Sequence, residues 1–145
     1  MFSQRIKDVM ERKKILIAPP DTTVSKAAKL MEERNVGAIM VVENEYLVGI
    51  FTERDVVFRV IARDRDVKTT RLAEVMTAKP LTVDPDKSFG YALLVMQENG
   101  FRHVPVVVDG KPVGIVSSRN ALDPEMEEFI SESQRRKYIQ QTMGV

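Results

Sequence analysis

The sequence predicts a mixed α/β (α+β) fold made of two β-α-β-β-α repeats related by pseudo-twofold symmetry, with a further helix at the C-terminus. The first observation is a repeat: residues 16–56 align without a gap with residues 81–121, and 11 of the 37 positions from 20 to 56 are identical. The second is that both copies end in the same turn, at 49–55 and 114–120. Two units are too few for a solenoid, so we expect two halves packed on each other.

Each repeat begins with a short strand followed by a helix. The apolar runs at 15–18 and 81–83 are stopped by prolines, which predicts brief strands. Thr23 and Ser88 occupy N-cap positions, and asparagine and glycine residues after 34 and 98 supply the helix ends. Apolar residues at i, i+3, i+4 and i+7 indicate one buried helix face in each repeat. They are Val24, Ala27, Ala28 and Met31, then Phe89, Ala92, Leu93 and Met96.

A hairpin and a second helix complete each repeat. Continuous apolar runs at 38–42 and 104–108 fit strands that are buried on both faces. Asp109-Gly110 predicts a tight turn, and Asn44-Glu45 is its weaker counterpart. The return strands cover 46–51 and 112–116. A helix then follows 49–55, and its expected apolar face is Val56, Val57, Val60 and Ile61.

The repeat boundaries divide the chain into four parts. The first repeat covers residues 6–62 and the second 74–122, and Val9-Met10 recurs as Val75-Met76. Residues 63–73 are rich in charge and are expected to form an exposed linker. The tail, 123–145, starts with an N-cap and a proline, Asp123-Pro124, which predicts a helix over 125–141. Its apolar residues leave two roles open, covering the core or binding a partner: Met126, Phe129, Ile130 and Tyr138.

Composition argues against several classes of protein. The 22 Lys and Arg residues against 21 Asp and Glu give a net charge of +1, which does not favour bulk electrostatic binding to nucleic acid or an anionic membrane. The chain has no cysteine for disulfides or thiol chemistry, and its single histidine does not favour a metal site. Without a signal peptide or a membrane-spanning apolar run, a cytoplasmic location is expected.

The turn shared by both repeats, which we call the closing turn, has two physical interpretations. The positions of Gly49, Thr52 and Asp55 recur as Gly114, Ser117 and Asn120. The hydroxyl and the acid three residues later can form a capping box at the start of a helix. Alternatively, N–H groups at the helix start bind a phosphate, and the glycine lets a ligand approach the backbone closely. The repetition at a fixed interval favours the second interpretation.

Together these motifs resemble a tandem pair of cystathionine-β-synthase (CBS) domains, also called a Bateman module. The resemblance covers about residues 6–122. It rests on Val-Met before the first strand, Pro-Asp before the helix, the Val-Val strand and the closing turn. The chain is similar to standalone members of the family that carry Arg-Asn-Val-Gly-Ala in the first repeat, here 34–38, and Arg-His-x-Pro-Val in the second, here 102–106.

The resemblance implies that adenine nucleotides bind in clefts between the two repeats. The Asp of the closing turn would bond ribose hydroxyls, and the Thr or Ser would contact phosphate or ribose. Here these residues are Asp55 with Thr52, and Asn120 with Ser117. Because an amide lacks the strength of a charge-assisted hydrogen bond, Asn120 implies a second site that differs in its ligand or stays empty.

The resemblance also implies further ligand-binding residues. Arg102 and His103, shortly before Pro105, would meet phosphate, although His103 also fits a simple rim hydrogen bond. The corresponding Gly37 and Ala38 supply no such charge, so the two sites are not expected to be equivalent. Adenine would lie against the first strands. The remaining expected residues are Gly49, Arg54, Gly114 and Arg119 of the closing turns, whose arginines also fit plain solvent exposure, and Ile17, Ala18, Thr82 and Val83 of the first strands.

Three classes of function can be compared with these features. The resemblance implies a regulatory, energy-sensing module that binds AMP, ADP, ATP or NAD/NADH and acts in trans on a protein partner. The alternative is an interaction module with vestigial ligand sites, because such modules pair into disc-like homodimers and eight methionines suit adaptable contacts. An enzyme is not expected, because no nucleophile–base pair or metal-ligand spacing occurs.

Overall fold

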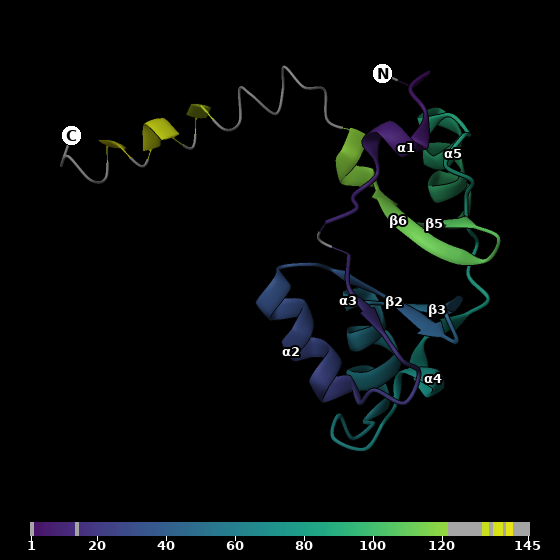
Figure 1. The fold of residues 1–145 in the computed structure, drawn as a ribbon. Helices are drawn as coiled ribbons and strands as arrows, with labels where there is room; N and C mark the ends of the chain where they lie inside the picture. The colour runs from purple at the N-terminus through teal and green to yellow at the C-terminus, as the bar shows by residue number, and fades with distance from the viewer. Residues whose placement is uncertain (1, 14, 122–131, 134, 138, 141–145) are drawn as a thin grey trace.

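In the computed structural model the chain forms two stacked halves, each with a small sheet and one long helix (Figure 1). The structure describes residues 2–13, 15–121, 132–133, 135–137 and 139–140. The two halves have the same arrangement of elements, so the predicted α+β fold built from two related repeats is confirmed.

The first half contains a four-stranded sheet in the order β1-β2-β3-β4. Strand β1 is parallel to β2, and the other pairs are antiparallel. Helix α2 packs against this sheet through Val24, Ala27 and Met31. Its N-cap is Thr23, as predicted, whose hydroxyl accepts the N–H of Lys26. The elements are β1 (Ile17–Ala18), α2 (Val24–Arg34), β2 (Ala38–Glu43), β3 (Tyr46–Thr52) and β4 (Thr77–Ala78).

The second half repeats this arrangement with shorter edges. Helix α5 (Phe89–Asn99) packs against the hairpin of β5 (His103–Val108) and β6 (Lys111–Ser117). Single bridges take the place of the edge strands: Val83 pairs in parallel with Val106, and Glu11 pairs antiparallel with Ile115. The strand predicted at 81–83 is therefore one bridge, and β4 was not predicted.

Both hairpin turns predicted from the sequence are present. Asn44 and Glu45 have φ values of 52° and 73°, and Asp109 and Gly110 have 52° and 78°. Positive φ at both central residues is what a two-residue hairpin turn requires. Asn44-Glu45 therefore turns the chain as Asp109-Gly110 does, although its sequence signal is weaker.

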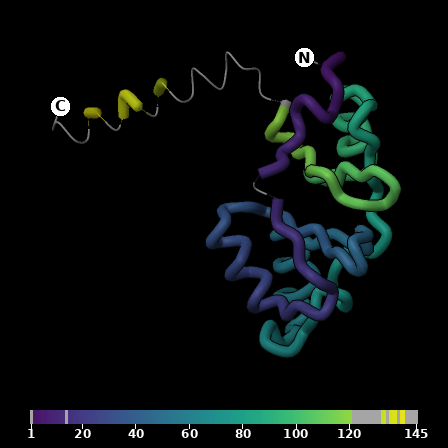
Figure 2. Tube along the Cα trace, in the orientation of Figure 1, coloured from purple at the N-terminus to yellow at the C-terminus, as the bar shows by residue number. Residues whose placement is uncertain are grey.

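The segments that precede the first strand of each repeat are exchanged between the halves. Helix α1 (Ile6–Val9) lies beside α5, and Ile6 is fully buried in the core of the second half. Helix α4 (Leu72–Val75) lies on the first half, where Leu72 and Val75 join the core. Figure 2 shows the purple N-terminal segment starting on the second half and then crossing to the first. The packed units therefore differ from the sequence repeats.

Two expectations for the middle of the chain need correction. The segment 63–73 is not simply an exposed linker, because Thr70 and Leu72 are buried and the N–H of Val24 donates to the Thr70 carbonyl. After α3 (Glu53–Asp55), the chain forms a π-helical turn, η1 (Val56–Val60), and a 3₁₀ turn, η2 (Ile61–Arg63). The wider π turn changes the helical period, so Val60 is buried while Val57 and Ile61 are more than half exposed.

The predicted tail helix lies mostly outside the described residues, as do Asp123-Pro124 and the apolar positions Met126, Phe129, Ile130 and Tyr138. The described tail residues, 132–133, 135–137 and 139–140, are helical. Within the part of the chain that the structure describes, no helix is long and apolar enough to cross a membrane.

Candidate functional site

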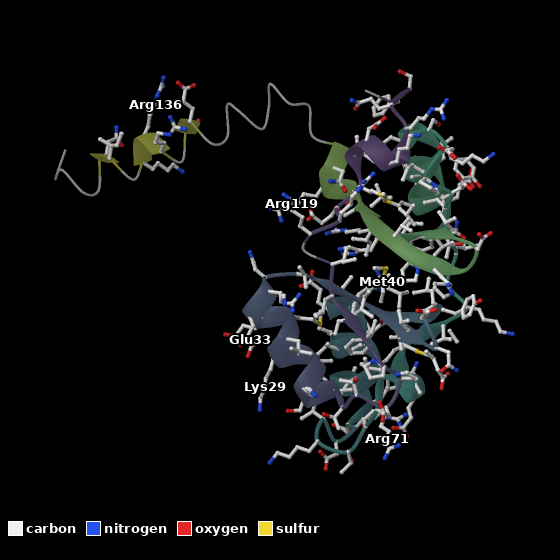
Figure 3. All side chains as sticks on the ribbon, in the orientation of Figure 1. Lys29, Glu33, Met40, Arg71, Arg119 and Arg136 are labelled. Carbon is white, nitrogen blue, oxygen red and sulfur yellow. The ribbon has the colours of Figure 1, made fainter. Side chains whose placement is uncertain are left out.

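Two cavities lie where the halves meet, one at each closing turn. The first has a volume of about 830 Å³ and contains the first closing turn, the segment around β4 and the residues that lead into β5. The second, of about 640 Å³, contains the corresponding residues of the other repeat. Met40, which lines the second cavity, lies between the halves in Figure 3. The cavities are therefore related by the same pseudo-symmetry as the repeats.

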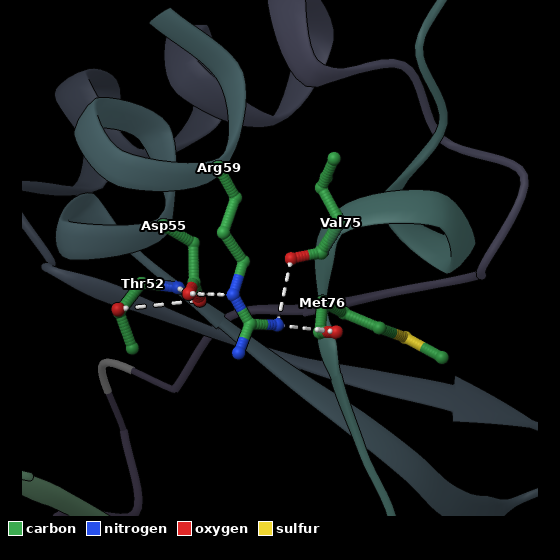
Figure 4. Close-up of polar contacts among 5 residues, drawn as sticks. All are labelled: Thr52, Asp55, Arg59, Val75 and Met76. Atoms are coloured by element: carbon green, nitrogen blue, oxygen red, sulfur yellow. Dashed lines mark hydrogen bonds and ion pairs between the residues drawn. The ribbon is translucent and has the colours of Figure 1, made fainter. Parts of the chain in front are cut away.

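The first closing turn is capped by its own side chains (Figure 4). Oδ2 of Asp55 accepts the Thr52 N–H at 2.9 Å and the Thr52 hydroxyl at 3.4 Å. Oδ1 of Asp55 pairs with Nε of Arg59 at 3.5 Å. Arg59 also donates to the carbonyls of Val75 and Met76, which ties this turn to α4. Both carboxylate oxygens are thus engaged within the protein, and ribose binding by Asp55 stays a prediction.

The second closing turn has the same geometry without the charge. Oδ1 of Asn120 accepts the Ser117 N–H at 2.8 Å and the Ser117 hydroxyl at 3.3 Å. A single oxygen makes both hydrogen bonds, so an amide can replace the carboxylate in this task. The Asp-to-Asn difference between the repeats therefore leaves these two hydrogen bonds intact.

The first backbone N–H group of each closing helix is already bonded. The N–H of Glu53 donates to the Gly37 carbonyl at 3.1 Å, and that of Ser118 donates to the Arg102 carbonyl at 3.0 Å. These bonds join each closing turn to the residue before the neighbouring strand. Side-chain cations are therefore better candidates than these N–H groups for contact with a phosphate.

Several predicted residues do line the cavities. Thr52, Arg54 and Asp55 of the first closing turn reach the first cavity, together with Arg102, His103 and Pro105 from the other half. Ser117, Arg119 and Asn120 reach the second cavity. Arg119 lies near the boundary of the two halves in Figure 3. The structure thus brings together the closing turn and the Arg-His pair, which are about 50 residues apart in the sequence.

Other predicted residues do not line either cavity. At Gly49 and Gly114 an added Cβ would meet the side chains of Met76 and Met10, so these glycines make room for protein packing and not for a ligand. The first-strand residues Ile17, Ala18, Thr82 and Val83 are also absent from the cavity walls, which instead contain Ile15, Leu16, Pro80 and Leu81. The residues that line the cavities therefore come about two positions earlier in the chain than predicted. Ala18 and Val83 are buried instead, where they pair with Val41 and Val106 of the neighbouring strands.

Arg102 and His103 differ in their surroundings. Arg102 is exposed, and its guanidinium makes no hydrogen bond or ion pair with any described residue. His103 is partly buried, and this burial lowers its pKa below the usual 6.5. Nearby Glu53 raises the pKa of His103 and Arg102 lowers it further, but burial is the largest effect. The lowered pKa favours the neutral form of His103 at pH 7.

Among the first-cavity residues that the sequence prediction did not include, three bear on ligand binding: Glu53, Phe58 and Lys79. The guanidinium of Arg54 lies 5.0 Å from the centre of the Phe58 ring, and this cation–π contact orients the Arg54 side chain. Lys79 had a detectable signal, because it corresponds to Lys13 at the same spacing that relates Met76 to Met10, and Lys13 lines the second cavity. Among the described residues, no group of three His, Asp or Glu side chains could hold a metal ion.

The chain matches the CBS domain family twice, at residues 6–62 and 72–124. It is 37% identical over 150 residues to the mitochondrial CBS domain-containing protein CBSX3 of Arabidopsis thaliana, covering 95% of this chain and 73% of that protein. It is also 37% identical over 112 residues to the CBS domain-containing protein YhcV of Bacillus subtilis, covering 77% and 79%.

Solved structures show the same fold. A conserved protein from Pyrococcus horikoshii aligns with a TM-score of 0.77 and 30% identity over 83% of this chain and 91% of that one. The CBS domain pair of protein MJ0100, in complex with 5′-methylthioadenosine and S-adenosyl-L-methionine, aligns with a TM-score of 0.74 and 26% identity over 81% and 92%.

Proposed function

The chain belongs to the CBS-domain family, and from this premise we propose that it is a regulatory module that binds an adenine nucleotide. The ligand class is AMP, ADP, ATP or NAD/NADH, and the first cavity is the main site. The module has no catalytic role, and the bound state is read by a protein partner in trans. The observation that carries this proposal is the combination of cations and apolar side chains in the first cavity.

The first cavity offers a surface for each part of a nucleotide. Its volume of about 830 Å³ lies within the range of about 300–1,000 Å³ that is usual for small-molecule sites. Ile50, Val57, Pro80 and Leu81 provide apolar surface for a base. Three cations without a carboxylate partner among the described residues provide charge for phosphate: Arg54, Lys79 and Arg102.

The comparison with MJ0100 supports the adenosyl part of this proposal. That domain pair holds two ligands that each contain adenosine, one uncharged and one cationic. Its likeness to this chain covers most of both chains. The phosphate part rests on the cations of this chain alone, so a test must separate adenosine from its phosphates.

We expect a nucleotide to raise the melting temperature of the ligand-free protein. The panel contains adenosine, AMP, ADP, ATP, NAD, NADH and S-adenosylmethionine. A ligand at a hundred times its Kd stabilises the folded state by about 2.7 kcal/mol, which corresponds to roughly 5–10 °C for a chain of this length. A phosphate-bearing member should give a shift of this size.

Two matched variants locate the effect. Arg102→Ala removes a cavity cation and should reduce the shift with AMP more than the shift with adenosine. Lys29→Ala removes an exposed cation from α2, away from both cavities (Figure 3), and should change neither. If no compound shifts the melting temperature of the wild-type protein, the proposal is wrong.

One observation favours the alternative, an interaction module that forms a homodimer. Val57, Phe58 and Ile61 are 54%, 57% and 58% exposed on the η1–η2 segment. Burial of such side chains against a second copy would be favourable. This alternative would be supported if no compound in the panel shifts the melting temperature and the protein sediments as a dimer. The cytoplasmic location stays a prediction, since one relative is named as mitochondrial.

A further inference from the structure

The single histidine of the chain lies on a wall that the two cavities share. His103 lines both cavities, together with Arg102 and Glu53. It is the first residue of β5, where it pairs with Ser117 of β6. The corresponding residue of the first repeat is Ala38, so the second repeat alone supplies this imidazole. A ligand in either cavity therefore meets the same ring.

Glu53 and His103 come together beside Gly37. A Cβ built on Gly37 would lie 2.8 Å from Oε1 of Glu53 and 3.7 Å from Cε1 of His103, so both side chains occupy space that a larger residue at 37 would need. The ring nitrogens of His103 have no hydrogen-bond or ion-pair partner among the described residues. No described side chain keeps a buried nitrogen or oxygen without a partner, which indicates that these nitrogens are open to the cavities.

The charge state of His103 depends on groups that a phosphate would change. Burial lowers the pKa of His103, Glu53 raises it and Arg102 lowers it further, and burial is the largest effect. A phosphate beside the ring would add negative charge, which favours the imidazolium form. By pairing with Arg102, it would also offset the positive charge that opposes protonation. Both effects raise the pKa of His103.

The other charged groups around His103 come from several segments of the cavity walls. In the first cavity they are Arg54, Lys79 and the ion pair of Asp55 with Arg59. In the second they are Lys13, Arg119 and Glu11, whose carboxylate accepts the N–H of Lys13. Cations outnumber carboxylates in both cavities, so the phosphate of a ligand is the group that can favour a charged imidazole.

Resting on the proposed function, we infer that His103 couples nucleotide binding to protonation, so that the chain takes up a proton when it binds a phosphate-bearing ligand and binds that ligand more tightly at acid pH. Because the phosphate favours the imidazolium, the imidazolium favours the phosphate by the same factor. This gain in affinity is fully present below the pKa of His103 in the ligand-free protein. It is lost as the pH rises through the higher pKa of His103 in the complex. Adenosine, which has no phosphate, lacks this coupling.

NMR of the full chain tests the coupling directly, because one histidine gives one set of imidazole signals. The imidazole signals are followed from about pH 8 to about pH 5, the range in which histidine usually titrates. Saturating AMP should raise the pKa of His103. Adenosine should leave this pKa unchanged or lower it through further burial. Lys29→Ala, which removes a cation away from both cavities, should show the same responses as the wild type.

His103→Gln extends the test to affinity. The phosphate of AMP itself titrates near a pKa of about 6, but the ratio of the AMP Kd values of the variant and the wild type removes this contribution. This ratio should be at least about fivefold larger at the acid end of the range than at the alkaline end. For adenosine the ratio should stay constant with pH.

The inference is overturned if AMP binds the wild-type protein without raising the pKa of His103, or if adenosine raises it as much as AMP does. It is also overturned if the ratio of the AMP Kd values does not change with pH. The wild-type NMR titration gives this answer even if His103→Gln fails to fold. In these outcomes nucleotide binding itself still stands. If no compound of the melting panel binds at all, the proposed function fails, and the inference fails with it.

Discussion

In both closing turns a hydroxyl-bearing residue is bonded to the acid or amide three residues later. Thr52 donates its N–H and its hydroxyl to Asp55, and Ser117 does the same to Asn120. Only Asp55 adds an ion pair, with Arg59. The residue that the family resemblance assigns to ribose therefore also holds the local backbone, and the two roles must be tested apart.

We predict that Asp55→Ala lowers the free energy of unfolding of the ligand-free protein by about 1 kcal/mol or more, because it removes a helix cap. Asp55→Asn should cost less than half as much, since the amide oxygen can accept the same hydrogen bonds, as Asn120 does. Urea denaturation measures both values. Asn120→Ala serves as the control in the other half, where a cap is lost without an ion pair.

An equal loss for Asp55→Ala and Asp55→Asn would contradict this account. It would mean that the charge pairing with Arg59, not the cap, makes the stabilising contribution. A variant that keeps the stability of the wild type but loses AMP binding would in turn support a direct ligand role, and Asp55→Asn is the substitution suited to show it.

At the scale of secondary-structure elements, each strand that leads into a closing turn, β3 or β6, is paired along its outer edge with a segment of the other repeat. β4 pairs with β3 at Gly49 and Ile50. In the second half, Glu11 and Ile115 exchange two backbone hydrogen bonds, of 2.9 and 3.1 Å. Gly49 and Gly114 lie at this contact, where the segment that belongs to the other repeat crosses the strand.

We predict that Gly114→Ala destabilises the protein more than Gly49→Ala. A Cβ at 114 would lie 3.0 Å from the Glu11 carbonyl, and this backbone group cannot move without breaking the bridge to Ile115. The three atoms nearest to a Cβ at 49 all belong to the flexible Met76 side chain, which can adopt another rotamer. Overpacking of this kind typically costs about 1–3 kcal/mol, and we expect Gly114→Ala in this range.

Thermal and urea unfolding of the two alanine variants measure the difference. Gly110→Ala is a useful third variant, since its φ of 78° makes the substitution strained for a reason unrelated to the bridge. If Gly49→Ala proved as costly as Gly114→Ala, the Met76 side chain would be held more rigidly than its contacts indicate.

For the whole molecule, the exchange of α1 and α4 means that each core depends on residues from the other repeat. Ile6 of the first repeat belongs to the core of the second half with Phe89 and Val104, whereas Val75 of the second repeat, with the adjoining Leu72, belongs to the core of the first half. The halves are also joined at the cavities, which neither half can form alone. We therefore expect two cores whose stabilities respond to distant parts of the sequence.

We predict that Ile6→Ala and Leu72→Ala, both at fully buried positions, each cost about 2–5 kcal/mol. Each substitution should weaken mainly the half in which its side chain is packed. Ile6→Ala should speed amide hydrogen exchange mainly in α5 and β5, and Leu72→Ala mainly in α2 and β2. Residue-resolved exchange measured by NMR tests this, because locally weakened regions exchange through smaller openings. Faster exchange in α2 after Ile6→Ala, with α5 unaffected, would contradict the exchanged packing.

Much of the fold could be predicted because its signals are local. Helix spacing and caps identified α2 and α5, continuous apolar runs identified the hairpin strands, and the turn residues placed both hairpins. The prediction failed where packing overrides the local pattern. The π-helical turn at 56–60 places Val57 at the surface, and the segment predicted as an exposed linker contains the buried residues Thr70 and Leu72.

The sequence by itself determined that the chain is a repeat, that the closing turns are related, and that Arg102 has only Gly37 as its counterpart. Only the tertiary structure decided that α1 and α4 exchange halves, that Ile15, Leu16, Pro80 and Leu81 line the cavities instead of the residues that follow them, and that Glu53, Arg102 and His103 face both cavities. The reason is physical. A sequence pattern reports which face of an element is apolar, whereas a cavity wall depends on how separate elements pack against each other.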